Sequence, residues 1–167
     1  MIVVLMGVSG SGKTTIGTLL AQRAGVVFAD ADDYHPLANK QKMAAGQPLD
    51  DDDRQPWLET LNCLLLDWQR DGVSGVLACS ALKEKYRGTL TSGIPEGAIH
   101  FVILAGSLEL IAKRLAARHH EYMDPALLDS QFKTLEPSAN AFTIVNDRAP
   151  DVVVNEILEH VGTPRQT

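Results

Sequence analysis

Aromatic residues and cysteine are scarce in this chain of 167 residues. Only 5% of the residues are Phe, Trp or Tyr, and only Cys63 and Cys79 are cysteine. The sequence contains no C-x-x-C pair, no H-E-x-x-H motif and no cluster of Cys and His. A structural zinc site therefore has no support. We expect the two cysteines to be small buried apolar residues rather than a disulfide.

Long apolar runs and a surplus of positive charge are also missing. No segment approaches the roughly 20 apolar residues of a membrane span, and the apolar N-terminus lacks the basic region of a signal peptide. The formal net charge is -6, from 21 acidic and 15 basic residues, and no basic stripe is interleaved with aromatics. These absences argue against membrane and nucleic-acid partners. We therefore expect a cytoplasmic protein.

The residues that are present fit one globular domain over 1–167, with 45% hydrophobic and 22% charged residues. Apolar segments typical of buried strands alternate with amphipathic helical segments. The predicted strands are 1–6, 26–29, 76–79, 100–104 and 142–145. This alternation predicts an α/β fold, a three-layer sandwich with a five-stranded parallel sheet and right-handed crossovers.

The most specific motif follows the first predicted strand. The segment Gly7-Val8-Ser9-Gly10-Ser11-Gly12-Lys13-Thr14 fits G-x-x-x-x-G-K-[ST], and a helix that ends at Gly25 is predicted to follow it. Such a loop brings backbone amides and a helix N-terminus to one anion. Lys13 would reach the β- and γ-phosphates, and the Thr14 hydroxyl would ligate Mg²⁺. We therefore predict that residues 7–14, together with Thr15, bind a nucleoside triphosphate.

Two carboxylates follow the second predicted strand, at Asp30 and Asp32. In an open parallel sheet ligands bind beyond the carboxyl ends of the strands, so this pair should lie beside the phosphate loop. One carboxylate could hold Mg²⁺ through water, and the other could take a proton from a substrate hydroxyl. The alternative is that Asp32 or Asp33 caps a helix ahead of Pro36.

Four adjacent aspartates, residues 50–53, precede Arg54. We expect residues 50–52 to be solvated and Asp53 to cap the helix that follows, whose apolar stripe from Trp57 to Trp68 belongs to the core. The Arg54 guanidinium is suited to bidentate recognition of a substrate carboxylate. A local ion pair is the competing interpretation.

Further basic pairs occur on two later helices. Lys83 and Arg87 lie one turn apart on a helix that Ser80 could cap, where they could clamp an anionic substrate or pair with Glu84 and solvent. Arg114 and Arg118 are spaced i and i+4 near the end of another helix, where basic groups are also favoured by the helix dipole. A break and a second helix, 126–135, come next. This pattern indicates a hinged lid over residues 114–137 that closes on phosphates.

Taken together, these segments resemble the gluconate kinase family of phosphate-loop small-molecule kinases. The resemblance extends in order over about four fifths of the chain and is carried by Gly7–Thr14, Asp30–Pro36, Lys42-Met43 with Gly46–Leu49, Asp53–Leu58, Cys79–Lys83 with Tyr86-Arg87, and Ser130–Phe132 with Leu135–Pro137. It implies a nucleoside-monophosphate-kinase-like fold, use of ATP and Mg²⁺, and phosphorylation of D-gluconate at its 6-hydroxyl. It also implies a homodimer.

The resemblance also implies roles for individual residues. Thr14 and Asp30 would hold Mg²⁺, as in the neighbouring shikimate kinases, and Asp32 would bind and deprotonate the acceptor hydroxyl. The expected gluconate contacts, besides Asp32, are His35, Arg54, Lys83 and Arg87. Arg118, with Arg114 as second choice, would neutralise the transferring phosphoryl group. The catalytic residues would thus be Lys13, Asp32 and Arg118.

Three rival functions share parts of this pattern. A kinase for shikimate or a related acid would keep the loop and the Asp30/Asp32 pair, but Cys79-Ser80-Ala81 stands where shikimate kinases carry three glycines. A GTP-dependent switch protein would need an Asn-Lys-x-Asp motif after a strand. The one Asn-Lys, at residues 39–40, follows no predicted strand and has no Asp two positions later. A catalytically silent ATP-binding regulator would be expected to have lost Lys13, Thr14 or the aspartate pair, and all of these residues are present.

Overall fold

Five parallel strands form the centre of the protein. The structure, a computed structural model, describes residues 1–117 and 125–162. The strands are β1 (Ile2–Met6), β2 (Val27–Asp30), β3 (Gly75–Ala78), β4 (Ile99–Ala105) and β5 (Ala141–Val145). They lie in the order β2-β3-β1-β4-β5, and every neighbouring pair is parallel. The prediction of a five-stranded parallel sheet is confirmed.

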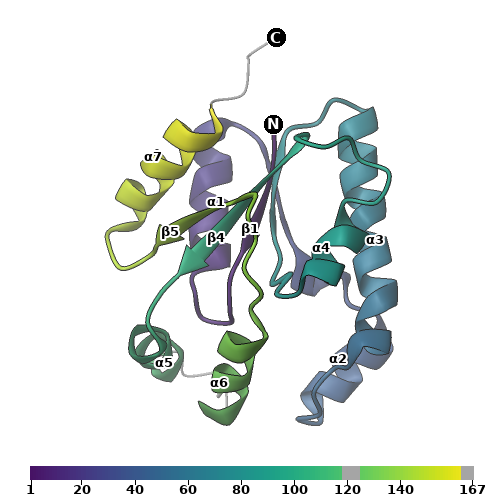
Figure 1. The fold of residues 1–167 in the computed structure, drawn as a ribbon, viewed down its shortest axis with the longest axis vertical. Helices are drawn as coiled ribbons and strands as arrows, with labels where there is room; N and C mark the ends of the chain where they lie inside the picture. The colour runs from purple at the N-terminus through teal and green to yellow at the C-terminus, as the bar shows by residue number, and fades with distance from the viewer. Residues whose placement is uncertain (118–124, 163–167) are drawn as a thin grey trace.

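Helices cover both faces of the sheet, which explains why β1 is apolar at every position. One face is covered by α3 (Asp51–Arg70) and α4 (Glu84–Leu90), and the other by α1 (Lys13–Ala24) and α7 (Pro150–Val161) (Figure 1). Val3 and Leu5 enter the core beneath α1 and α7, whereas their neighbours in β1 enter the core beneath α3 and α4. The expected three-layer sandwich is therefore present.

The remaining helices lie near the carboxyl ends of the strands, at the bottom of Figure 1. They are the 3-10 turn η1 (Ala31–Tyr34), α2 (Leu37–Ala44), α5 (Leu108–Ala116) and α6 (Pro125–Thr134). A third apolar core, which we call the loop cluster, joins the phosphate loop to α5 and α6. Its buried members are Val8, Leu82, Ile111, Leu115 and Leu128, and Phe132 and Leu135 pack against it.

Two helices start at residues that differ from the prediction. Asp50, not Asp53, is the N-cap of α3, and the two aspartates form a reciprocal capping box. Helix α4 begins at Glu84 with Lys83 as its N-cap, so Ser80 does not cap it. The reason is that Ala81 has a φ of 38°, a left-handed conformation that a helix cannot contain.

Two expectations from composition can also be compared with the structure. Both cysteines are free; Cys79 is buried as expected, but Cys63 is exposed on α3. Within residues 1–117 and 125–162, no helix combines the length and the apolar character that crossing a bilayer requires.

Candidate functional site

The phosphate loop follows β1 and leads directly into α1, as its mechanism requires. Gly12 is the N-cap of α1 with a φ of 96°, and a Cβ there would lie 2.6 Å from Asn146 Nδ2. A Cβ on Gly10 would lie 2.7 Å from Leu115 Cγ in the loop cluster. Both glycines are thus required by backbone conformation and by close packing. The first amides of α1 have no acceptor within the helix and provide an anion site.

Polar groups inside the loop fit a phosphate ligand. The Lys13 ammonium donates to the carbonyl oxygens of Gly7 and Val8, at 2.9 and 3.0 Å. The Ser11 hydroxyl is buried and has no hydrogen-bond partner in the described part of the chain. Asn146, directly after β5, is also buried and donates from Nδ2 to Ser11 O at 2.8 Å. The loop is therefore held from outside, while Lys13 lies along its interior carbonyls.

The predicted metal ligands come together at the start of α1. The Thr14 hydroxyl donates to Asp30 Oδ2 at 2.8 Å, and Asp30 Oδ1 accepts from the Asp32 amide at 3.1 Å. Asp30 is the last residue of β2, and Asp32 lies in η1 with its side chain 83% exposed. The strand-end rule therefore placed Asp30 beside the loop correctly, and the backbone amide of Asp32 is bonded to it.

The donor set at Thr14 and Asp30 fits Mg²⁺. One hydroxyl and one carboxylate are hard oxygen ligands, and Mg²⁺ in kinases is bound by one or two such groups together with phosphate oxygens and water. Among the described residues, no group of three or more His, Cys, Asp or Glu side chains could hold a metal by itself. The loop and this pair can therefore accommodate a nucleotide and its ion together.

His35 lies next to Asp32 in a buried, uncharged state. Its ring stacks on Trp57 with centroids 4.3 Å apart, and its side chain is 5% exposed. Burial, followed by the positive charges of Arg54 and Lys40, lowers the His35 pKa to about 4. Asn39 Nδ2 lies 3.3 Å from His35 Nδ1, so Nδ1 accepts and Nε2 carries the proton. That Nε2 lies 3.9 Å from Asp32 Oδ1.

Lys83 and Arg54 both approach the ring of Tyr86. Lys83 Nζ lies 5.4 Å and the Arg54 guanidinium 5.8 Å from the centre of the Tyr86 ring. Asp51, which we expected to be solvated, accepts hydrogen bonds from Lys83 at 3.0 Å and from Lys85 and Tyr86. These donors, Lys85 first, lower the pKa of Asp51, and its hydrogen bond raises the pKa of Lys83. Asp51 thus holds Lys83, one of the predicted substrate-binding residues, together with Tyr86, whose ring Arg54 approaches.

Arg87, a third predicted substrate contact, is 3% exposed and holds the backbone around it. Its guanidinium donates to the carbonyls of Ala81, Leu82 and Pro137 at 3.0 to 3.2 Å. It also pairs with Glu84 at 2.5 Å. These bonds fix the left-handed turn at Ala81 and connect it to the segment that follows α6. A direct contact between Arg87 and a substrate stays a prediction.

Of the two arginines in the predicted lid, the structure describes Arg114 but not Arg118. Arg114 is half-buried on α5, one residue before Leu115, which packs beside the phosphate loop. Arg118 lies outside the described residues, as do residues 119–124 of the break predicted over 119–125, whereas Pro125 begins α6. The position of Arg114 is thus compatible with a nucleotide contact.

Sequence reasoning missed three residues that shape the site. Gln131 Oε1 accepts from the Ser9 amide at 2.7 Å, and Asn146 and Asp51 make the contacts given above. Asn146 directly follows a predicted strand, so the strand-end rule used for Asp30 could have found it. Gln131 lay within a segment that carried the family resemblance, but its partner could not be read from the chain.

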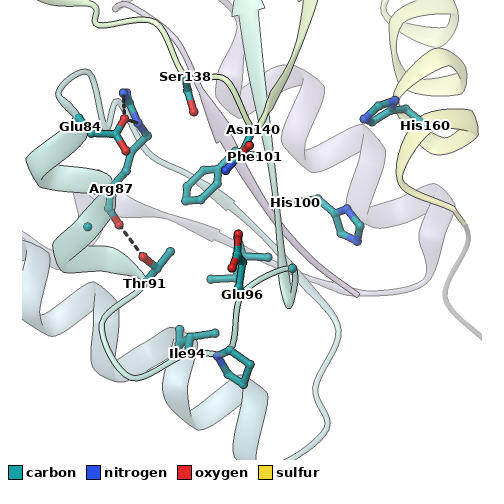
Figure 2. A pocket seen from close by; sticks show the side chains of 14 residues that line it. Glu84, Arg87, Thr91, Ile94, Glu96, His100, Phe101, Ser138, Asn140 and His160 are labelled. Atoms are coloured by element: carbon teal, nitrogen blue, oxygen red, sulfur yellow. Dashed lines mark hydrogen bonds and ion pairs between the residues drawn. The ribbon is translucent and has the colours of Figure 1, made fainter.

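A cavity of about 540 Å³ lies elsewhere on the protein. Figure 2 shows it between Arg87 on α4, Phe101 near the start of β4, and His160 on α7. Phe101 pairs with Val4, whereas the phosphate loop leaves the sheet after Met6. None of the loop residues 7–15 lines this cavity. The nucleotide site is therefore separate from it.

Solved structures of known proteins have the same fold. The gluconokinase from Sinorhizobium meliloti 1021 superposes with a TM-score of 0.85 at 36% identity, covering 95% of this chain and 90% of that one. A shikimate kinase from Aquifex aeolicus superposes with a TM-score of 0.61 at 19% identity, covering 96% of each chain. The second likeness shows the fold alone, that of a phosphate-loop kinase.

Sequence comparisons identify the family. A model described as "AAA domain" matches residues 2–138. A protein named "Probable gluconokinase" from Xenopus tropicalis is 47% identical over 173 residues, covering 94% of this chain and 91% of the relative. A gluconokinase from Arabidopsis thaliana is 42% identical over 174 residues, covering 96% and 92%. With the loop, the metal pair and the fold in agreement, the chain belongs to the gluconokinase family of phosphate-loop kinases.

Proposed function

We propose that this protein transfers the terminal phosphoryl group of ATP to the 6-hydroxyl of D-gluconate, giving 6-phospho-D-gluconate and ADP. The observation that carries the proposal is the contact of 2.8 Å between Thr14 and Asp30, with Asp32 hydrogen-bonded beside it at the end of the phosphate loop. This arrangement supports a phosphoryl donor on one side and a hydroxyl acceptor on the other. The choice of gluconate is supported by relatives named gluconokinase.

On the donor side, the loop residues 7–15 would bind the phosphates of ATP. Lys13 would leave its loop carbonyls to meet the β- and γ-phosphates. Thr14 and Asp30 would hold Mg²⁺, which when bound offsets negative charge on the phosphates. Arg114 and Arg118 would add positive charge from a lid over 114–137. Cations and alignment, rather than covalent chemistry, would supply most of the acceleration.

On the acceptor side, Asp32 would accept the proton of the 6-hydroxyl. The hydroxyl oxygen bonds to the γ-phosphorus at the same time, and the bond between that phosphorus and the oxygen of ADP breaks. A carboxylate that is mostly exposed before substrate binds is available for this role. The Nε2–H group of neutral His35 would donate to Asp32 or to a substrate hydroxyl. Arg54 and Lys83 would bind the gluconate carboxylate. Arg87, which bonds to the carbonyls of Ala81 and Leu82 beside Lys83, would be a further gluconate contact.

We also propose that the protein works as a homodimer in the cytoplasm. The dimer is supported by resemblance to the family, and the location by the expected use of ATP. Sedimentation velocity tests the dimer directly, since a species with the mass of one chain at micromolar concentration would contradict it. Fractionation of cells that produce the protein tests its location.

A coupled assay of ADP release across several acceptors tests the activity. We expect the highest kcat/KM with D-gluconate, among gluconate epimers, shikimate and nucleoside monophosphates. The Lys13→Ala variant, purified identically, reports contaminating kinases. A clearly higher kcat/KM with another acceptor would overturn the proposal and favour a kinase for shikimate or a related sugar acid.

A further inference from the structure

Helix α6 contacts both sides of the proposed reaction site. Near its C-terminal end, Gln131 Oε1 accepts a hydrogen bond of 2.7 Å from the amide of Ser9 in the phosphate loop. Immediately after the helix, the amide of Glu136 donates to Leu82 O at 2.8 Å. Leu82 precedes Lys83, a proposed gluconate contact. Residues 131–136, from the end of α6 onward, therefore connect the donor loop to the acceptor segment.

Apolar packing fixes the Gln131 side of this connection. Leu128 is 2% exposed and lies in the loop cluster with Val8 of the phosphate loop. Phe132 and Leu135 pack against the same cluster. Leu128 lies one helical turn before Gln131, and Leu135, which directly follows the helix, donates from its amide to Gln131 O at 3.0 Å, so apolar residues hold the chain on both sides of Gln131. The carboxamide is thereby aimed at the loop by its own helix.

Hydrogen bonds fix the opposite side. The amide of Glu84 donates to Glu136 Oε2 at 2.6 Å. The buried Arg87 guanidinium bonds to Pro137 O at 3.1 Å and to Leu82 O at 3.2 Å. Two of these contacts join residues 82–87 to residues 136–137, as the bond from the Glu136 amide to Leu82 O also does, and the third holds Arg87 to its own segment. Movement of α6 would therefore be transmitted to Lys83.

We propose that Gln131 is a positioning residue for phosphoryl transfer. By holding the Ser9 amide it sets the distance between the phosphate loop and the segment that carries Lys83, and so aligns the two substrates. This inference rests on the proposed function. Its physical basis is that a misplacement of about 1 Å between reacting groups costs roughly a hundredfold in rate.

The test compares Gln131→Leu with Lys133→Ala on the same helix. Leucine retains the bulk of glutamine and removes the acceptor, whereas Lys133 is 75% exposed and pairs only with Asp129 among the described residues. We expect Gln131→Leu to lower kcat by about 10- to 100-fold with little change in ATP affinity. Lys133→Ala should match the wild type. Melting temperatures of all three proteins should agree.

A second variant separates positioning from bulk. Gln131→Glu keeps an oxygen acceptor for Ser9 but adds negative charge near the nucleotide. At saturating ATP its kcat should stay within about threefold of the wild type, while its KM for ATP rises. In the nucleotide-free protein, the NMR shift of the Ser9 amide proton should move in Gln131→Leu and remain in Lys133→Ala.

Two results would overturn the inference: a Gln131→Leu kcat within twofold of the control, or a fall in melting temperature and ATP affinity that accounts for the lost rate. Failure of the proposed function looks different. If the wild type prefers another acceptor, the same variants are compared with that acceptor, and the Ser9 amide shift is read without any acceptor.

Discussion

The nucleotide side of the site and the side proposed to receive gluconate are built in different ways. The phosphate loop consists of consecutive residues, 7–14, whose conformation is set by glycines and by the start of α1. The acceptor side joins Lys83 to Asp51, which lies 32 residues earlier, and places Arg54 and Tyr86 around them. One side is thus encoded by a local motif, and the other exists only in the folded chain.

The electrostatics differ in the same way. On the donor side, backbone amides at a helix N-terminus provide fixed partial charges that no single side-chain change removes. On the acceptor side, the charges belong to side chains and are balanced by Asp51. Apart from the side chains of Lys13, Thr14 and Asp30, the donor side should therefore be most sensitive to backbone changes, and the acceptor side to side-chain changes. Four predictions test this contrast, from the largest effect to the smallest.

The first change, Asp32→Asn, should lower kcat by about 10² to 10⁴ because it removes the proposed base. ATP affinity should remain, since asparagine keeps the size and shape of the Asp32 side chain, which is 83% exposed. Rapid-quench turnover and calorimetric titration with an ATP analogue measure the two quantities. Near-normal turnover would show that Asp32 is not the base, and that a side-chain change on the acceptor side need not lower kcat.

The second change, Gly12→Ala, places a methyl group 2.6 Å from Asn146 Nδ2 in a left-handed conformation. We expect the free energy of unfolding to fall by about 2 to 4 kcal/mol and the KM for ATP to rise. Gly25→Ala is the matched control, because Gly25 has a φ of 66° with open space around it. It should cost about 1 kcal/mol and leave the KM unchanged. Equal effects would show that backbone conformation alone matters.

The third prediction concerns pH. The pKa of His35 is about 4 in the folded protein and about 6.5 in the unfolded chain. Between these two pH values, His35 is protonated in the unfolded chain but not in the folded protein. Stability is therefore full above pH 6.5 and falls as pH drops to 4, by up to about 3 kcal/mol. Urea unfolding at several pH values measures the slope. His35→Gln should flatten it, and an unchanged slope would assign the loss to other groups.

The fourth change, Lys83→Met, should raise the KM for gluconate about tenfold, because a bond to a carboxylate is lost, and should spare the KM for ATP. Lys85→Met is the control: both lysines bond to Asp51, but only Lys83 is proposed to meet the substrate. Steady-state kinetics over both substrates provides the comparison. If the two variants have equal KM values for gluconate, Lys83 acts only through Asp51.

The parts that could be predicted from sequence depend on local signals. An unbroken apolar run predicted the central strand, and the spacing from Gly7 to Thr14 predicted the loop and the helix behind it. The contact between Thr14 and Asp30 followed from a general rule about strand ends. In these cases, neighbouring residues and one topological rule determine the outcome.

The parts that could not be predicted depend on partners distant in the chain. Four adjacent aspartates give nearly identical local signals, and the fold of residues 83–86 decides that Asp51 accepts their hydrogen bonds. Ser80 has the chemistry of a helix cap, but the left-handed Ala81, held by Arg87, delays the helix to Glu84. A sequence pattern contains no information on such tertiary bonds.

The central place of β1 has a consequence for how the chain acquires its structure. β1 pairs with β3 on one side and with β4 on the other. During synthesis, the first strand must therefore wait until Gly75–Ala78, and then Ile99–Ala105, have left the ribosome. β1 is thus made before either of its neighbours, and until both have paired with it, its apolar segment stays open to chaperones or to wrong pairing.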